Sequence, residues 1–296
     1  MKLKGILFAI ISSIIFGTTG IIQKPLYLDN VNPLDVLTIA YAVGSLVLSI
    51  YISLFKGKKA IILPKESLKH VIIHSTFGML AVTVSFSYSL KYLDVSIATM
   101  LIYTYPIIIA LYSILVLKKR FSITKIISVF GTLIGCILVL DIFNAKKFSS
   151  LGLCIGIFSA FAYAFLNLYG DKLLKYKLEP VTILFYNCLI TFIALIIINN
   201  KILFNIKDIS PHVFFSSALV SILGQIIPMF LLYIAIKLIG PVLSSIITTI
   251  EIPAVAILSF IFLNEKISLI QCVGIFIVLL CILLIEIEKP ENENKC

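Results

Sequence analysis

One carboxylate lies deep inside an apolar segment of this 296-residue chain, at the end of a row of polar side chains. In "SSIITTIEIPAVAIL" (244–258), Ser244, Thr248 and Glu251 recur at intervals of four and three residues, so a helix would carry them on one face. An ionised carboxylate at the centre of a membrane helix costs about 3 kcal/mol on insertion scales, so it should face a cavity or a partner. Glu251 could therefore bind a substrate amine or carry a proton.

Glu251 could also have a purely structural role, in one of two ways. A lysine could reach it from a helix end, or its oxygens could accept hydrogen bonds from backbone groups that Pro253 frees. The polar row has a structural alternative as well, because Ser and Thr also pack membrane helices against one another.

Further polar side chains lie within other apolar segments. An amide surrounded by hydrocarbon must find hydrogen-bond partners, and a central cavity would supply them. An ordinary hydrogen bond between helices would serve equally well. On the cavity interpretation, substrate contacts are expected from Thr19, Tyr103, Tyr163, Asn167, Asn187, Gln225, Ser244, Thr248 and Glu251.

Three prolines interrupt apolar segments, at Pro106, Pro228 and Pro253. Each removes a backbone donor and bends its helix, which could help a gate to close or could be a packing kink. His74 can titrate near neutral pH, but its place close to a predicted helix end indicates an interfacial residue.

The composition places most of the chain in a lipid bilayer. Hydrophobic residues make up 60%, charged residues 13%, and the mean hydropathy is +1.15. A membrane helix needs about 20 apolar residues, and glycine, serine and threonine among leucine and isoleucine favour helices over barrel strands. The sequence predicts an all-α membrane protein with ten spans, at 5–23, 36–55, 71–90, 95–117, 123–141, 151–170, 181–198, 212–236, 241–263 and 268–287.

The basic charges predict the orientation. With both termini in the cytoplasm, only seven of the 24 Lys and Arg residues face outward, namely Lys24, Lys91, Lys146, Lys147, Lys201, Lys207 and Lys266. This is the positive-inside pattern, and it explains the formal charge of +10 without a nucleic acid partner. The first segment has no small-residue cleavage site and is expected to remain as the first span.

The second half of the chain repeats the first. At an offset of 146, residues 90–122 align with 236–268 without a gap, and Gly78 aligns with Gly224. Tyr105 then aligns with Glu251, so one half alone carries the acid. We expect a five-helix repeat at 1–148, a second at 149–288 and a polar tail at 289–296. Because five is odd, the two repeats should be inverted, an arrangement typical of transporters that work by alternating access.

Several kinds of chemistry are missing from the sequence. There is no Walker A loop, no HExxH motif, no Cys/His cluster, no CxxC pair and no pair of intramembrane acids. We therefore expect neither an enzyme nor a bound cofactor or metal ion.

Two segments resemble the EamA family of the drug/metabolite transporter superfamily. "EIPAVAILSFIFLNEKISLIQCVGIFIVLLCILL" (251–284) is similar to the family's acid and proline, its later glutamate, and the glutamine and glycine of its last helix. "SSIIFGTTGIIQK" (12–24) resembles the opening of its first helix, with Phe16 where the family often has tryptophan. The resemblance implies ten short helices and a central cavity lined by spans 1, 3, 4, 6, 8 and 9.

The resemblance and the residues together predict a secondary transporter in the cytoplasmic membrane. It would export small polar metabolites such as amino acids by alternating access, with proton coupling through Glu251 as one option. Solute exchange, drug or quaternary-amine efflux and, from another class, a lipid-modifying enzyme are the alternatives. The expected partners are a small-molecule substrate, the bilayer and protons, with no nucleic acid, and the chain is expected to be a monomer or weak homodimer.

Overall fold

The protein is built from helices throughout the part of the chain that the structure describes. The computed structural model describes residues 2–29, 31–57, 62–93, 95–118, 121–140, 149–202, 209–254, 256–257 and 268–287. The helices of the first half are α1 (Lys2–Leu28), α2 (Pro33–Tyr51), η1 (Ile52–Lys56), α3 (Lys65–Ile73), η3 (His74–Leu80), α4 (Ala81–Tyr92), α5 (Val95–Ile102), α6 (Tyr105–Leu115) and α7 (Ile123–Val139). Those of the second half are α8 (Ser150–Lys175), α9 (Pro180–Ile198), α11 (Pro211–Ser221), η6 (Ile222–Ile226), α12 (Ile227–Ile247), η7 (Thr248–Ile250) and α14 (Leu269–Ile287).

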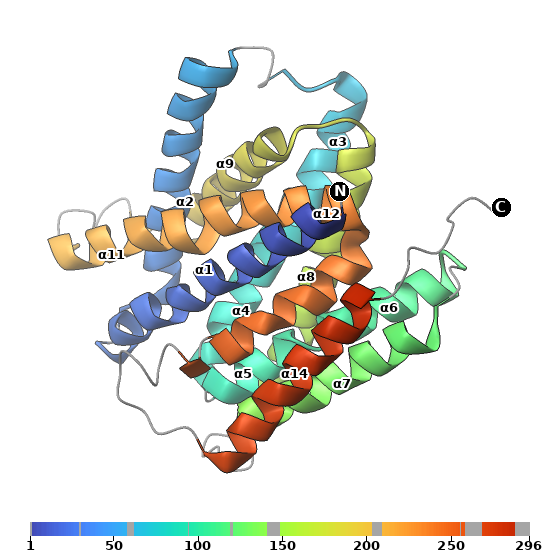
Figure 1. Cartoon of the computed structure of the whole chain (residues 1–296). Coiled ribbons are helices and arrows are strands. Elements are labelled where there is room, and N and C mark those ends of the chain that lie inside the picture. Colours follow the sequence, from blue (N-terminus) through green and yellow to red (C-terminus); the bar gives the residue numbers. More distant parts are fainter. Residues whose placement is uncertain are drawn as a thin grey trace.

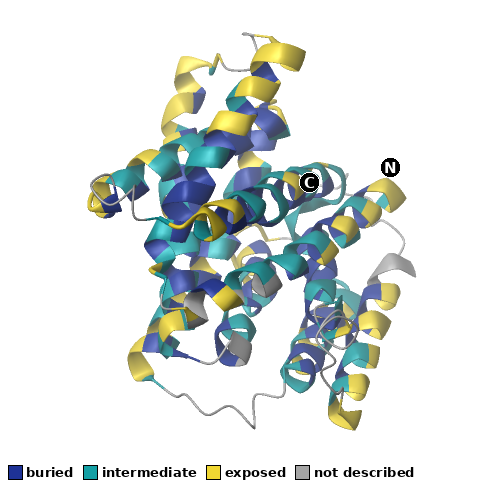
Figure 2. Cartoon of the chain, turned by 90° about the vertical axis from the view of Figure 1, so that its left-hand side faces the viewer, coloured by how far each residue is buried: buried dark blue, intermediate teal, exposed yellow. Residues whose placement is uncertain are grey.

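Seven helical stretches among the described residues are long and apolar enough to cross a membrane. The last of them, Pro211–Ala254, has 44 residues, and two further apolar helices of 10–17 residues cover Ile123–Val139 and Leu269–Leu284. Large apolar side chains such as Phe276 and Leu115 point outward, where a soluble protein would carry charge. Figure 2 shows exposed residues along the outer sides and ends of the helices and buried ones toward the middle.

A single residue divides the 44-residue stretch. Gly240 has φ 77° and ψ 167°, which is not helical, and Pro241 follows it. Glycine adopts this backbone conformation without steric cost, and proline is well suited to begin the next helix. The break lies between the predicted spans 212–236 and 241–263, although residues 258–263 of the second span and the tail 289–296 lie outside the described residues.

The helices pair across the two halves of the chain. Helix α1 packs along α12, α4 along α8, α2 along α9, and α7 along α14 (Figure 1). At the offset of 146–147, α1 corresponds to α8 and α4 to α12, so the first two pairs exchange with each other under the repeat. Reciprocal pairing of this kind is what a two-fold relation between the halves requires.

Departures from the α-helix also occur at matching places. The π-helical turns η3 and η6 include Gly78 and Gly224, which the repeat aligns. A Cβ on Gly78 would lie 3.2 Å from Leu166 Cα, and one on Gly224 would lie 2.6 Å from Thr19 Cγ2. Both glycines therefore allow a close approach to a helix of the other half. π-Helical turns are frequent at functional sites.

Helices α7 and α14 form a pair of their own, side by side in Figure 1. Glycines let the two backbones meet, because a Cβ on Gly135 would lie 2.9 Å from the Gly274 oxygen. Ser128 Oγ also donates to the Cys281 oxygen across the pair at 3.0 Å. Small residues and such hydrogen bonds hold membrane helices together, because in lipid the hydrophobic effect does not drive helices to associate.

We predict that Gly135→Leu separates this pair. The leucine would overlap Val278 and the Gly274 backbone, and overpacking costs about 1–3 kcal/mol. Unfolding in mixed micelles, followed by circular dichroism, should show that loss. Ile134→Leu is the matched control, because Ile134 is 53% exposed on the other side of the same helix. Equal stability of the two variants would contradict the packing described here.

Candidate functional site

The Glu251 carboxyl group lies among three tyrosines from α8 and from the start of α6 and the break before it. Glu251 follows the 3-10 turn η7, and its side chain is hydrogen-bonded to the hydroxyl of Tyr103, at the break between α5 and α6. Tyr105 and Tyr163 are also close enough for an electrostatic interaction with the carboxyl group. The acid of the second half is therefore met by side chains of the first half and by α8.

The two positions that the repeat aligns, 105 and 251, lie in one cluster. The Tyr105 hydroxyl is hydrogen-bonded to Thr248 Oγ1 and lies 3.3 Å from the Ser245 oxygen. Its ring is tilted against that of Tyr163, with 4.4 Å between the ring centroids. Tyr103 lies 6.1 Å from Tyr105 by the same measure. These contacts join α6 to η7 and the end of α12.

The described residues offer Glu251 no lysine or arginine. No basic residue is buried in the part of the chain that the structure describes apart from the histidine discussed below. The ion pairs found there join Lys56 to Glu179 at 3.0 Å and Lys175 to Asp171 at 2.6 Å, both at exposed helix ends. In the structure a hydrogen bond from Tyr103 takes the place of an ion pair.

Several of the predicted cavity residues have buried polar atoms without a partner. Asn167 Nδ2 donates to the Tyr163 oxygen at 2.8 Å, which leaves its Oδ1 unpaired. Gln225 Oε1 and Thr19 Oγ1 are also buried and unpaired. Buried polar atoms are nearly always satisfied, so each of these atoms calls for a ligand or water.

Ser244 and Thr248, also predicted to line a cavity, are both buried and bonded within the protein. Ser244 Oγ donates to the Gly240 oxygen at 2.8 Å, one turn back in its own helix. Thr248 Oγ1 donates to the Ser245 oxygen at 3.0 Å, besides its contact with Tyr105. Thr248 therefore joins its segment to α6, whereas Ser244 is bonded within its own helix.

Asn187 belongs to a second polar cluster. Its amide contacts His74, Ser75 and Tyr233, which come from η3 and α12. His74 is 0% exposed, so the prediction of an interfacial histidine was wrong. The π-helical turn η3 turns the histidine toward α8 and α9. The position of His74 in the sequence did not indicate that its side chain is buried. Ser75 and the aligned glycine Gly78 belong to the same turn.

All three predicted gating prolines lie at changes of helix type. Pro106 opens α6 after the break at 103–104, Pro228 opens α12 after η6, and Pro253 follows η7. A proline in a first turn loses no helical hydrogen bond, so these prolines mark where the chain already changes geometry.

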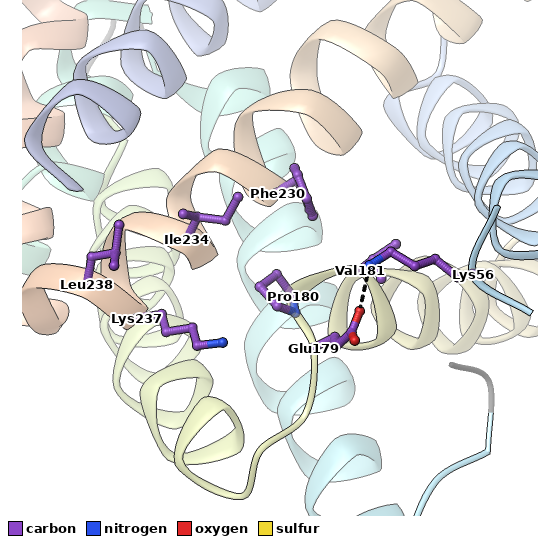
Figure 3. A pocket seen from close by; sticks show the side chains of 8 residues that line it. All are labelled: Lys56, Glu179, Pro180, Val181, Phe230, Ile234, Lys237 and Leu238. Carbon is purple, nitrogen blue, oxygen red and sulfur yellow. Dashed lines mark hydrogen bonds and ion pairs between the residues drawn. The ribbon is translucent and has the colours of Figure 1, made fainter. Parts of the chain in front are cut away.

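A pocket of about 390 Å³ lies away from Glu251, near one end of the helices. It is lined by Lys56, Glu179, Pro180, Val181, Phe230, Ile234, Lys237 and Leu238 (Figure 3). The ion pair between Lys56 and Glu179 closes one side of it. None of the predicted cavity residues lines this pocket, so it is a surface feature separate from the tyrosine cluster.

Each half of the chain matches the model of the same known family. The model of the EamA-like transporter family matches residues 3–141 and again residues 150–287. The chain belongs to the EamA-like transporter family. This membership confirms the resemblance seen in the sequence, and with the apolar helices it makes the chain a multi-pass protein of the cell membrane.

Two proteins are similar to this chain along nearly its whole length. An uncharacterised inner membrane transporter, YicL of Salmonella typhimurium (strain LT2), is 24% identical over 297 residues, covering 97% of this chain and 96% of the relative. A solved structure, described only as the crystal structure of a protein, superposes with a TM-score of 0.75 at 14% identity, covering 96% of this chain and 97% of the other. The second likeness shows that the fold of this EamA-like chain is one already observed.

We predict that a hydrophobic carbodiimide, which reacts with protonated carboxyl groups in apolar surroundings, modifies Glu251. Glu251 is partly exposed and, among the described residues, has no basic partner. Peptide mass spectrometry should find the adduct at Glu251 and lose it in Glu251→Gln. Glu179 is exposed to water and serves as the internal comparison. Modification of Glu179 with none at Glu251 would show that the carboxyl group is inaccessible or permanently charged.

Proposed function

We propose that the protein exports small polar metabolites such as amino acids by alternating access, with Glu251 as the residue that binds the substrate amine. The observation that carries this proposal is a carboxyl group without a basic partner among the described residues, placed where the two halves of an EamA-like transporter meet. The nine residues predicted to line a cavity form the proposed substrate path. We expect these residues to line an open cavity in another conformation of the proposed transport cycle.

The buried polar groups among the described residues favour an amine as the substrate. Glu251 contributes carboxylate oxygens, and Asn167 and Gln225 contribute unpaired amide oxygens, all of which accept hydrogen bonds. An ammonium group carries several donors and a positive charge. The rings of Tyr105 and Tyr163 add faces that attract cations, which also favours the alternative of a quaternary amine.

Ten spans with both termini inside are the topology we propose. The breaks at Gly240 and at residues 103–104 support it, as does the reciprocal pairing of the helices. A 44-residue helix would be about 66 Å long at 1.5 Å per residue, twice the thickness of the hydrocarbon core. Division at Gly240 gives two segments of suitable length, and the basic residues then follow the positive-inside rule.

Proton coupling through Glu251 is part of the same proposal. A proton and a substrate ammonium would compete for one carboxyl group, so uptake of one would release the other. Inverted repeats allow a shared site of this kind to open to each side in turn. Exchange of one solute for another is the competing mechanism. It requires substrate on the opposite side and ignores an imposed pH gradient.

We predict that Glu251→Gln abolishes transport while the protein still folds. Glutamine keeps the size and the contact with Tyr103 but removes the charge and the exchangeable proton. Flux of labelled amino acids and amines into proteoliposomes, with and without a pH jump, measures the effect, and a loss of at least about 100-fold is expected for a deleted charged contact.

Glu179→Gln is the matched control for that experiment. It removes an exposed carboxylate from an ion pair that carries little energy, so flux should stay within a factor of about two to three. Wild-type flux in Glu251→Gln, at equal protein incorporation, would refute the proposed role.

A further inference from the structure

His74 lies at the centre of a hydrogen-bond network that joins four helices. It begins the π-helical turn η3 and is 0% exposed. Its Nε2 lies 3.0 Å from the Leu166 oxygen of α8, and its Nδ1 lies 3.0 Å from Oδ1 of Asn187 in α9. The network continues to Tyr233 of α12, whose hydroxyl accepts from Asn187 Nδ2 at 2.7 Å. Asn187 also belongs to the proposed substrate path, whereas His74 and Tyr233 have no part in the proposed transport role of Glu251.

One nitrogen of His74 has a fixed role. The partner of Nε2 is a backbone carbonyl oxygen, which can only accept. Nε2 must therefore carry a hydrogen in every protonation state that keeps this contact. The remaining nitrogen, Nδ1, is then the atom at which a neutral and a charged histidine differ.

The orientation of the Asn187 amide depends on that second nitrogen. With Oδ1 toward Nδ1, as the structure places it, Nδ1 must donate and the ring is an imidazolium. With the amide turned by about 180°, Nδ2 donates to a bare Nδ1 and the ring is neutral. Oxygen and nitrogen of an amide fill nearly the same space, so both orientations fit the site equally well.

The other partners of the amide permit both orientations. Ser75 Oγ donates to Oδ1 at 2.8 Å in the present orientation and would accept from Nδ2 in the other. The Tyr233 hydroxyl accepts now and would donate after the turn. Hydroxyl groups can do either, so no hydrogen bond is lost when the amide turns.

We propose that His74 and Asn187 form a proton-binding site, in which a proton taken up at Nδ1 is matched by a turn of the Asn187 amide. The ligand is a proton from water, and no other group changes its bonds. Because Tyr233 changes between acceptor and donor, the protonation state of a first-half residue alters hydrogen bonding in α12 of the second half. This gives the transporter a second titrating centre, separate from Glu251.

Titratable side chains from α3, α8, α9 and α12 surround His74. Tyr169 of α8 and Tyr233 of α12 face the imidazole, with ring centroids at 6.2 and 6.1 Å. His70 of α3 is one turn away, bonded to the Tyr169 hydroxyl at 2.7 Å, and Lys172 lies 5.0 Å above the Tyr169 ring. From α9 the neighbouring titratable group is Cys188, which is buried. No carboxylate among the described residues is bonded to His74, so its two oxygen partners are the groups that would hold the imidazolium.

Nitrogen NMR of the imidazole tests this directly. The chain has 3 histidines, so His70→Gln with His212→Gln leaves His74 as the one labelled ring. Between about pH 9 and about pH 4, we expect the spectrum to change from one protonated nitrogen, Nε2, to two. One unchanging neutral form over that range, or a neutral form protonated at Nδ1, would overturn the proposal.

Asn187→Leu provides the second measurement in the same labelled background. Leucine removes the only described acceptor at Nδ1, so the titration should shift by at least about one pH unit or disappear, about a tenfold change in proton affinity. Ser75→Ala is the matched control, because it removes a bond to Asn187 and leaves both contacts of His74. Equal titration in all three proteins would show that Asn187 plays no part in binding the proton.

These spectra do not depend on the proposed function. They need folded protein in micelles and no transported substrate, so a titrating His74 would stand even if Glu251→Gln transported normally. Conversely, a His74 that does not titrate would leave the proposed role of Glu251 unaffected.

Discussion

The hydrogen bond between Tyr103 and Glu251 is the interaction on which the rest of the site depends. A carboxyl group within an apolar segment must have its oxygens satisfied or its charge compensated, and no lysine or arginine is buried among the described residues. Tyr103 can be its partner because the helix is interrupted between α5 and α6. In the other half, the 3-10 turn η7 interrupts the α-helix just before Glu251. These two irregularities, related by the repeat, bring the halves together at one point.

The two halves share their helix arrangement but differ in the titratable residues that they carry. The halves share π-helical turns at aligned glycines and pair their helices reciprocally. At the aligned positions 105 and 251 they differ, with a tyrosine in one half and a carboxylic acid in the other. A second asymmetry follows at the other polar centre, because His74 of the first half corresponds to Val220 of the second. Each half therefore contributes one titratable group that the other lacks.

Much of the architecture could be predicted because it follows from local pattern. Apolar length and turn residues located the helices, and the aligned Gly78 and Gly224 indicated the repeat. The family membership of the chain agrees with both. The surroundings of Glu251 were harder to predict, since the sequence marks Tyr103 and Tyr163 only as cavity residues and Tyr105 only as the aligned position. Contacts between α6, α8 and η7 depend on packing that no local pattern encodes.

The cluster around His74 could not be predicted for a related reason. A histidine near a predicted span end is usually interfacial, but His74 begins a π-helical turn that packs closely against α8. Asn187 is recognisable in the sequence as an amide that needs partners, but nothing there shows that its partners are a histidine and two hydroxyls. The unpaired oxygens of Asn167 and Gln225 likewise emerge only from the packed structure.

Proton release on ligand binding tests the central claim most directly. If an ammonium ligand and a proton compete for Glu251, adding amine to purified protein in weakly buffered micelles near neutral pH should release protons in proportion to the ligand bound. In Glu251→Gln that release should disappear. Binding of amine to the wild-type protein without any release of protons, or equal release by the two proteins, would contradict the account.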